Sequence, residues 1–203
     1  MTPLTAFRPE QTQPETLRFA RQCLSPEPEG LTGIFQPDVN LAVWQRTLSA
    51  PLTDYAHFLL HNLPLPLQQM LPVSAIAADT GKQLPDGPGK AAFIADLVQI
   101  AEMFACLMDC PQLGLRLRVL DQPMCPRFHT DHLVCRLVCT YTGPATEWHA
   151  GPVTAAEPAR QLQSGDVALL KGSGWEDSAC YAISHRSPAS PESRLLLTLD
   201  PVF

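Results

Sequence analysis

The sequence has no run that approaches the roughly 20 uninterrupted apolar residues needed to span a bilayer. Its first ten residues also lack an apolar region behind a basic start, so they indicate no secretory signal. Basic residues are scarcer than acidic ones, at 14 against 20, which gives a formal net charge of -6. Because nucleic acids and anionic membranes attract positive surfaces, this balance argues against both as partners. We therefore expect a soluble, cytoplasmic protein.

Internal repeats and low-complexity tracts are absent as well. The 203 residues suit one domain, and the hydrophobic content of 45% is enough for a core. The seven cysteines are an odd number that cannot all pair, and we expect reduced thiols. Five of them lack a spacing typical of metal ligands and are predicted to be core residues: Cys23, Cys106, Cys110, Cys139 and Cys180.

Residues 1–112 are predicted to be mainly helical, with proline-rich connections. The clearest helix follows the Asp86–Gly89 loop and ends before Pro111. Its apolar residues recur at steps of three and four, which is the period of one helix face. Further helices are expected over residues 14–24, from an Asp38 N-cap through Leu48, and over residues 52–60.

From residue 113 the period changes to two, because Leu113, Leu115 and Leu117 alternate with other residues. Short strand-like runs separated by glycine and proline turns at this spacing favour a small barrel or jelly-roll sandwich. We therefore predict an α+β fold in one compact domain, with a helical region over 1–112 packed on a β-sandwich over 113–203. The expected strands cover residues 113–119, 133–141, 146–149, 167–171, 181–184 and 194–199.

His129 and Asp131 form a candidate metal-binding pair. On a strand, residues two apart point to the same face, so an imidazole and a carboxylate can bind one ion. His185, at the end of a later strand-like run, is the best placed third ligand. Two histidines and one carboxylate are the facial triad of iron(II) oxygenases, which leaves coordination positions open for a cosubstrate and dioxygen. The sequence therefore predicts a mononuclear site made by these three residues.

Cys125 introduces an alternative metal. It is four residues from His129, or about 13 Å along a strand, and reaches the same ion only where the chain bends. Pro126 favours such a bend. A thiolate as fourth ligand would close a tetrahedral site, which is typical of structural zinc. A non-catalytic zinc-binding protein therefore stays an alternative, as does a small-anion-binding module with a vestigial metal.

Several runs within residues 120–200 form a wider pattern. They are Cys125-x-x-Phe128-His129-x-Asp131, Arg136-Leu137, Thr140-Tyr141-x-Gly143-Pro144-x-Thr146-Glu147-Trp148, Lys171-Gly172 and His185-Arg186-Ser187-Pro188. Together they resemble the bacterial family DUF1826, a domain of unknown function, although Ala145 stands where the family pattern has Gly. The resemblance implies a fold and a residue pattern but no substrate. Members are often associated with zinc-homeostasis genes, which keeps a zinc protein of metal homeostasis as the alternative.

The C-terminal half also looks like the iron(II)/2-oxoglutarate oxygenase superfamily, whose fold is a cupin-like double-stranded β-helix. Arg194, nine residues after His185, resembles the arginine that binds the distal carboxylate of the cosubstrate, and Arg186 is a second candidate. The resemblance implies Fe(II) and 2-oxoglutarate as cofactors, with zinc as the alternative, and a dioxygenase acting on an unidentified small molecule. A homodimer is left open, because such barrels commonly pair. Further residues expected in the pocket or behind the ligands are Glu147, Arg136, Tyr141 and Lys171.

Overall fold

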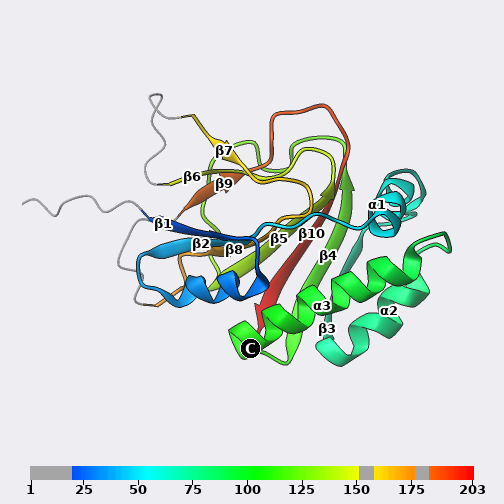
Figure 1. Ribbon diagram of the computed structural model, residues 1–203, viewed down its shortest axis with the longest axis horizontal. Helices are drawn as coiled ribbons and strands as arrows, with labels where there is room; N and C mark the ends of the chain where they lie inside the picture. The colour runs from blue at the N-terminus through cyan, green and yellow to red at the C-terminus, as the bar shows by residue number, and fades with distance from the viewer. Residues whose placement is uncertain (1–19, 151–157, 177–182) are drawn as a thin grey trace, which may run out of the picture.

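The structure is a computed structural model that describes residues 20–150, 158–176 and 183–203. The fold is mixed α+β, with a large sheet that carries helices on one face and a smaller sheet on the other (Figure 1). The large sheet has seven strands in the order β1-β2-β8-β5-β10-β4-β3, antiparallel except for the β1–β2 pair. These strands are β1 (Arg21–Ser25), β2 (Val39–Trp44), β3 (Leu67–Pro72), β4 (Gln112–Leu120), β5 (Cys135–Thr142), β8 (Val167–Lys171) and β10 (Arg194–Val202).

The smaller sheet is antiparallel, with the order β7-β6-β9. It consists of β6 (Glu147–His149), β7 (Arg160–Gln161) and β9 (Ser184–Arg186). Its Trp148 packs with Leu41, Val138 and Leu170 of the large sheet in a core of their own. The face of the large sheet that looks away from the helices is therefore partly covered by this second sheet.

The helical layer consists of α1 (Ala50–Asn62), α2 (Ile76–Gln83) and α3 (Lys90–Met108), with short 3-10 segments at Pro28–Phe35 and Val73–Ala75. α1 and α3 contact β10, where the leucines at odd positions point towards them. α3 has 19 residues and a mean hydropathy of 1.7, so it alone among the described helices meets the length and composition needed to cross a membrane. A core helix meets the same criterion, and Phe93, Leu97 and Phe104 are buried in the core.

Residues 1–112 contribute strands as well as helices, which corrects the prediction of a mainly helical region. The helix expected after Asp38 is β2, and residues 21–25 of the helix expected over 14–24 are β1, while residues 14–19 lie outside the described part. β2 is hydrogen-bonded on both edges and buried on both faces, with Ala42 in one core and Leu41 and Val43 in the other. A strand buried on both faces loses the alternation that distinguishes it from a helix.

β3, α2 and β7 were not predicted, whereas several other elements agree closely with the patterns that predicted them. The helices expected over 52–60 and before Pro111 are α1 and α3, and the strand expected over 113–119 is β4. The strand expected over 181–184 instead begins at Ser184, and residues 181–182 lie outside the described part. On β4, β5 and β10 the odd-numbered residues face the helices, so the even-numbered ones face the other side of the sheet. That second face carries the site described next.

Candidate metal centre

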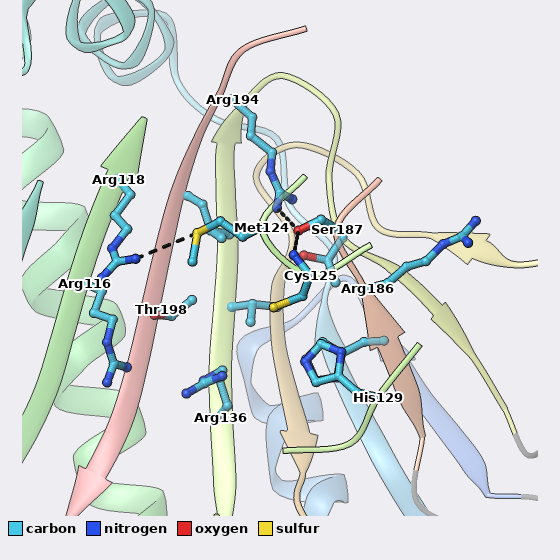
Figure 2. Close-up of a pocket in the computed structure, with 14 residues that line it drawn as sticks. Arg116, Arg118, Met124, Cys125, His129, Arg136, Arg186, Ser187, Arg194 and Thr198 are labelled. Carbon is cyan, nitrogen blue, oxygen red and sulfur yellow. Dashed lines mark hydrogen bonds between the residues drawn. The ribbon is translucent and has the colours of Figure 1, made fainter. Parts of the chain in front are cut away.

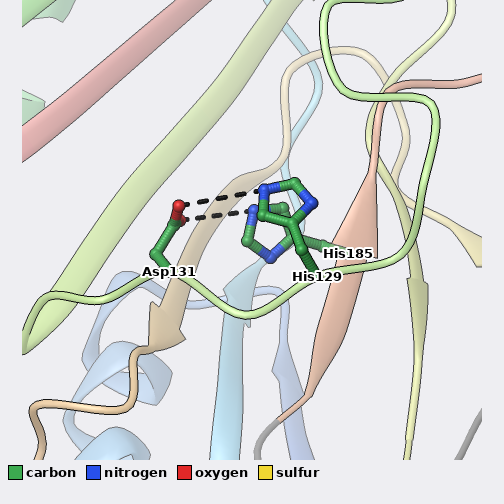
Figure 3. A group of neighbouring side chains, drawn as sticks. All are labelled: His129, Asp131 and His185. Atoms are coloured by element: carbon green, nitrogen blue, oxygen red, sulfur yellow. Dashed lines mark ion pairs between the residues drawn. The ribbon is translucent and has the colours of Figure 1, made fainter.

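His129, Asp131 and His185 converge where the chain between β4 and β5 meets β9 (Figure 3). His129 and His185 form an isolated antiparallel bridge, in which each backbone N–H donates to the other carbonyl at 3.1 and 2.9 Å. This pairing sets the two imidazoles side by side, with ring centroids 4.5 Å apart. Asp131 Oδ2 is 3.3 Å from His185 Nε2, and Oδ1 is 3.9 Å from His129 Nε2. One potential ligand atom from each residue lies within 4.8 Å of the other two.

Arg136 holds the carboxylate of Asp131 in place. Its Nη1 donates to Asp131 Oδ1 at 2.8 Å, while its Nε and Nη2 donate to Asp200 at 2.7 and 2.9 Å. Burial raises the pKa of Asp131, but the adjacent His185 and the charge of Arg136 outweigh burial and lower it. Asp131 is therefore ionised at neutral pH, and its Oδ1 is already engaged.

The three residues fit a divalent metal ion. Asp131 Oδ2 is buried and accepts no hydrogen bond within the described part of the chain, although it faces the His185 ring. An unpaired buried carboxylate oxygen is costly, and a cation shared with the two imidazoles would satisfy it. Two imidazoles and one carboxylate are also a donor set typical of non-haem iron.

Cys125 does not complete a fourth position. Its backbone N–H donates to Ser187 Oγ at 3.3 Å and its carbonyl accepts from the Ser187 N–H at 2.9 Å, which places it in the same pocket. Among the described residues, however, the group of mutually close ligand atoms contains only the two histidines and Asp131. The bend at Pro126 therefore does not bring the thiol into the set, and the tetrahedral zinc site is not supported.

His129 and His185 of the triad line a cavity of about 230 Å³ that is rich in arginine (Figure 2). Arg194, the first residue of β10, is only 4% exposed. Its Nη2 donates to Ser187 Oγ at 2.9 Å, and its buried Nη1 has no hydrogen-bond partner within the described residues. Burial lowers the pKa of this guanidinium from its ordinary value. A buried guanidinium without a carboxylate partner is suited to binding an anion in the cavity.

The profile of a family described as "Protein of unknown function (DUF1826)" matches residues 25–200. The chain belongs to this family. No curated protein matches the sequence. Among solved structures, a dioxygenase for auxin oxidation from rice is similar at 14% identity and a TM-score of 0.53, over 86% of this chain and 78% of that one. JOX2, solved in complex with 2OG, Fe and JA, is similar at 10% identity and a TM-score of 0.52, over 99% and 81% of the two chains. These likenesses show that the DUF1826 protein has the fold of iron(II)/2-oxoglutarate oxygenases.

Arg186 and Glu147 of the DUF1826 protein form a pair with each other. Arg186 lines the cavity, but its Nε donates to Glu147 Oε2 at 2.6 Å and its guanidinium lies 4.4 Å from the centre of the Phe128 ring. Glu147 was expected behind a ligand histidine, and it instead neutralises Arg186. The reason is register, because the two residues are direct partners across β6 and β9. Arg194 is thus the better carboxylate ligand of the two arginines.

Tyr141 and Lys171 lie away from the pocket, contrary to expectation. The Tyr141 hydroxyl donates to Asp96 of α3 at 2.9 Å, and Lys171 Nζ donates to the carbonyl of Gln36 at 2.9 Å. Tyr141 is at an odd position of β5, and Lys171 pairs with odd-numbered Cys135, so both share the face that looks towards the helical layer and the 3-10 segment. Arg136, at an even position, lines the pocket.

Several pocket residues were not predicted from the sequence. Arg116 and Arg118 project from β4 into the cavity, Ser187 binds Arg194, and Asp200 binds both Arg116 and Arg136. The alternation of arginine with leucine on β4 could have indicated these residues. Arginine is rarely buried unless it is paired, so two arginines on one face of a strand in the sheet suggest that this face binds a partner or a ligand.

Gly172 allows β8 to end directly against the segment that carries Asp131. The Ser173 N–H donates to the Asp131 carbonyl at 2.9 Å, and a Cβ at Gly172 would lie 1.9 Å from Leu133 O and 2.7 Å from Asp131 O. Gly172→Ala should therefore displace Asp131 and weaken Mn(II) binding by about 10-fold or more, measured by calorimetry. Gly114→Ala is the control, because its Cβ would meet only ordinary contacts at 3.7 Å. Native-like circular dichroism with unchanged Mn(II) affinity in Gly172→Ala would contradict this account.

Proposed function

We propose that this DUF1826 protein is an iron(II)- and 2-oxoglutarate-dependent oxygenase that acts on a small molecule. The observation that carries the proposal is a cavity lined by His129 and His185 of the triad and by Arg194, a buried arginine that has no carboxylate partner among the described residues. A 2-oxo dicarboxylate needs both features. Its 2-oxo acid end requires open metal positions, and its distal carboxylate requires a cation at a distance.

The arrangement of the sheets supports the proposal. In a double-stranded β-helix, β4, β10, β5 and β8 would form one side and β6, β7 and β9 the other, with the triad between them. The rice protein of similar fold is named for auxin oxidation, and JOX2 was solved with 2OG and Fe. The likeness in fold agrees with the chemistry that the triad and Arg194 would support in this chain.

Each side chain then has a definite role. His129, Asp131 and His185 would hold the iron, which when bound would supply the oxidative decarboxylation of 2-oxoglutarate by O₂ to succinate and CO₂, with one oxygen atom entering succinate and the other inserted into a substrate C–H bond. Arg136 fixes Asp131 Oδ1 and leaves Oδ2 directed at His185. Arg194 and Ser187 would orient the distal carboxylate, and Leu196, on the same face of β10, would supply an apolar wall beside it.

Anaerobic addition of Fe(II) and 2-oxoglutarate tests the proposal. We expect a visible absorption band that requires both additions, followed by slow formation of succinate when oxygen is admitted. Glutarate is the matched control, because it keeps both carboxylates but lacks the 2-oxo group and should produce no band. If the full mixture gives neither the band nor succinate, the oxygenase assignment fails.

A further inference from the structure

The cavity holds more arginine than the surrounding carboxylates neutralise. Five arginines line it, and within the described residues they pair with three carboxylates. Asp200 binds Arg116 and Arg136, while Asp131 also binds Arg136 and Glu147 binds Arg186. Among the residues that the structure describes, two of the five, Arg118 and Arg194, have no carboxylate partner. In a chain with a net charge of -6, positive charge is thus concentrated in one cavity.

Arg118 is held in the cavity by neutral groups. Its Nη2 donates to the side-chain carbonyl of Gln68 on β3, and its Nη1 lies 3.8 Å from Met124 Sδ. Its Nε is buried and has no hydrogen-bond partner within the described part of the chain. An amide and a thioether orient a guanidinium without cancelling its charge, which leaves that charge available to an anion.

The proposed cosubstrate does not use Arg118. One carboxylate of 2-oxoglutarate would lie at the metal and the other at Arg194, so a second cationic position is left. Arg118 is the direct partner of Leu196 across β4 and β10, and Arg194 is two residues from Leu196 on the same strand. Leu196 and Met124 therefore add apolar surface to the cavity wall that carries Arg118, and Figure 2 shows Met124 beside Arg118.

We infer that the substrate of this site is a small organic anion, a carboxylate or a phosphate with an apolar body, and that Arg118 binds its charged group. The inference rests on the proposed function, because it assigns Arg194 to the cosubstrate. Arg118 is a specificity residue here, since a guanidinium with neutral partners favours a charged ligand over a neutral one of the same shape.

Matched probes test this inference by calorimetry on protein loaded with Mn(II) and 2-oxoglutarate. The probes are benzoate and phenyl phosphate, with benzamide as the neutral counterpart. We expect at least one anion to bind about 10-fold or more tightly than benzamide, which is the effect of one charge-assisted hydrogen bond. Arg118→Gln should lose this preference, and Arg118→Lys should keep part of it. Arg160→Gln removes an exposed arginine outside the cavity and should behave like the unaltered protein.

The outcomes separate this inference from the proposed function. Arg118→Gln should bind 2-oxoglutarate as the unaltered protein does, so loss of the cosubstrate in this variant would overturn the inference. Equal binding of anions and benzamide by the unaltered protein, or an anion preference that survives in Arg118→Gln, would also overturn it. If 2-oxoglutarate does not bind at all, the proposed function fails. The same probe series on protein with Mn(II) alone then still measures whether Arg118 gives a preference for anions over benzamide.

Discussion

Asp131→Asn should weaken the binding of Fe(II) or Mn(II) by at least about 100-fold. Loss of a residue that only supports a metal ligand lowers metal affinity by up to about 100-fold, so loss of a ligand itself should lower it by at least that factor. The amide keeps the size of the side chain but removes the negative charge that faces His185 and His129. The fold should survive, because Arg136 keeps two hydrogen bonds to Asp200. Anaerobic calorimetry with Fe(II), or electron paramagnetic resonance with Mn(II), measures the loss.

Asp121→Asn is the matched control for this prediction. Asp121 is exposed and lies in the same connection between β4 and β5, but it does not belong to the group of close ligand atoms. Its removal changes the net charge equally and should leave metal affinity unchanged. A metal affinity in Asp131→Asn equal to that of the Asp121→Asn control would place the ion somewhere else in the molecule.

The triad was predictable from sequence because its first two members are local neighbours. His129 and Asp131 need only a short extended segment to share a face, and no knowledge of topology is required. His185, by contrast, had to be chosen among residues that are distant in the sequence. In the structure, the backbone bridge to His129 places it beside the other two ligands. The position of Cys125 depended on the bend at Pro126, and the spacing of residues alone does not determine such a bend.

The errors around the pocket have a common physical cause. Arg136 and Tyr141 were both assigned to the pocket, yet on one strand they have opposite parity and face opposite sides. Which parity faces the helices depends on where α3 packs, and that contact is not local in sequence. Arg118 was missed for a related reason: the alternation on β4 indicates one charged face, but the position of Arg118 beside Leu196 follows from the pairing of β4 with β10. The sequence shows which residues of a strand share a face, whereas only the tertiary arrangement shows which face lines the pocket.

Arg194→Gln should raise the dissociation constant for 2-oxoglutarate by about 30-fold or more while leaving metal affinity unchanged. Removing one partner of a buried, hydrogen-bonded charge pair costs about 2–5 kcal/mol, which corresponds to at least that factor. Arg194 meets this description because it is 4% exposed and only Ser187 occupies its guanidinium among the described residues. Titration of Mn(II)-loaded protein with 2-oxoglutarate measures the change.

Two comparisons make this result specific to the distal carboxylate. The first is 2-oxobutyrate, which keeps the 2-oxo acid but lacks that carboxylate, so its affinity should be the same in Arg194→Gln and the unaltered protein. The second is Arg186→Gln, which removes an arginine that Glu147 already neutralises and should change 2-oxoglutarate affinity much less. A larger loss in Arg186→Gln than in Arg194→Gln would reverse the assignment. Whether an arginine already has a carboxylate partner, rather than its distance from His185 in the sequence, then decides which of the two arginines binds the cosubstrate.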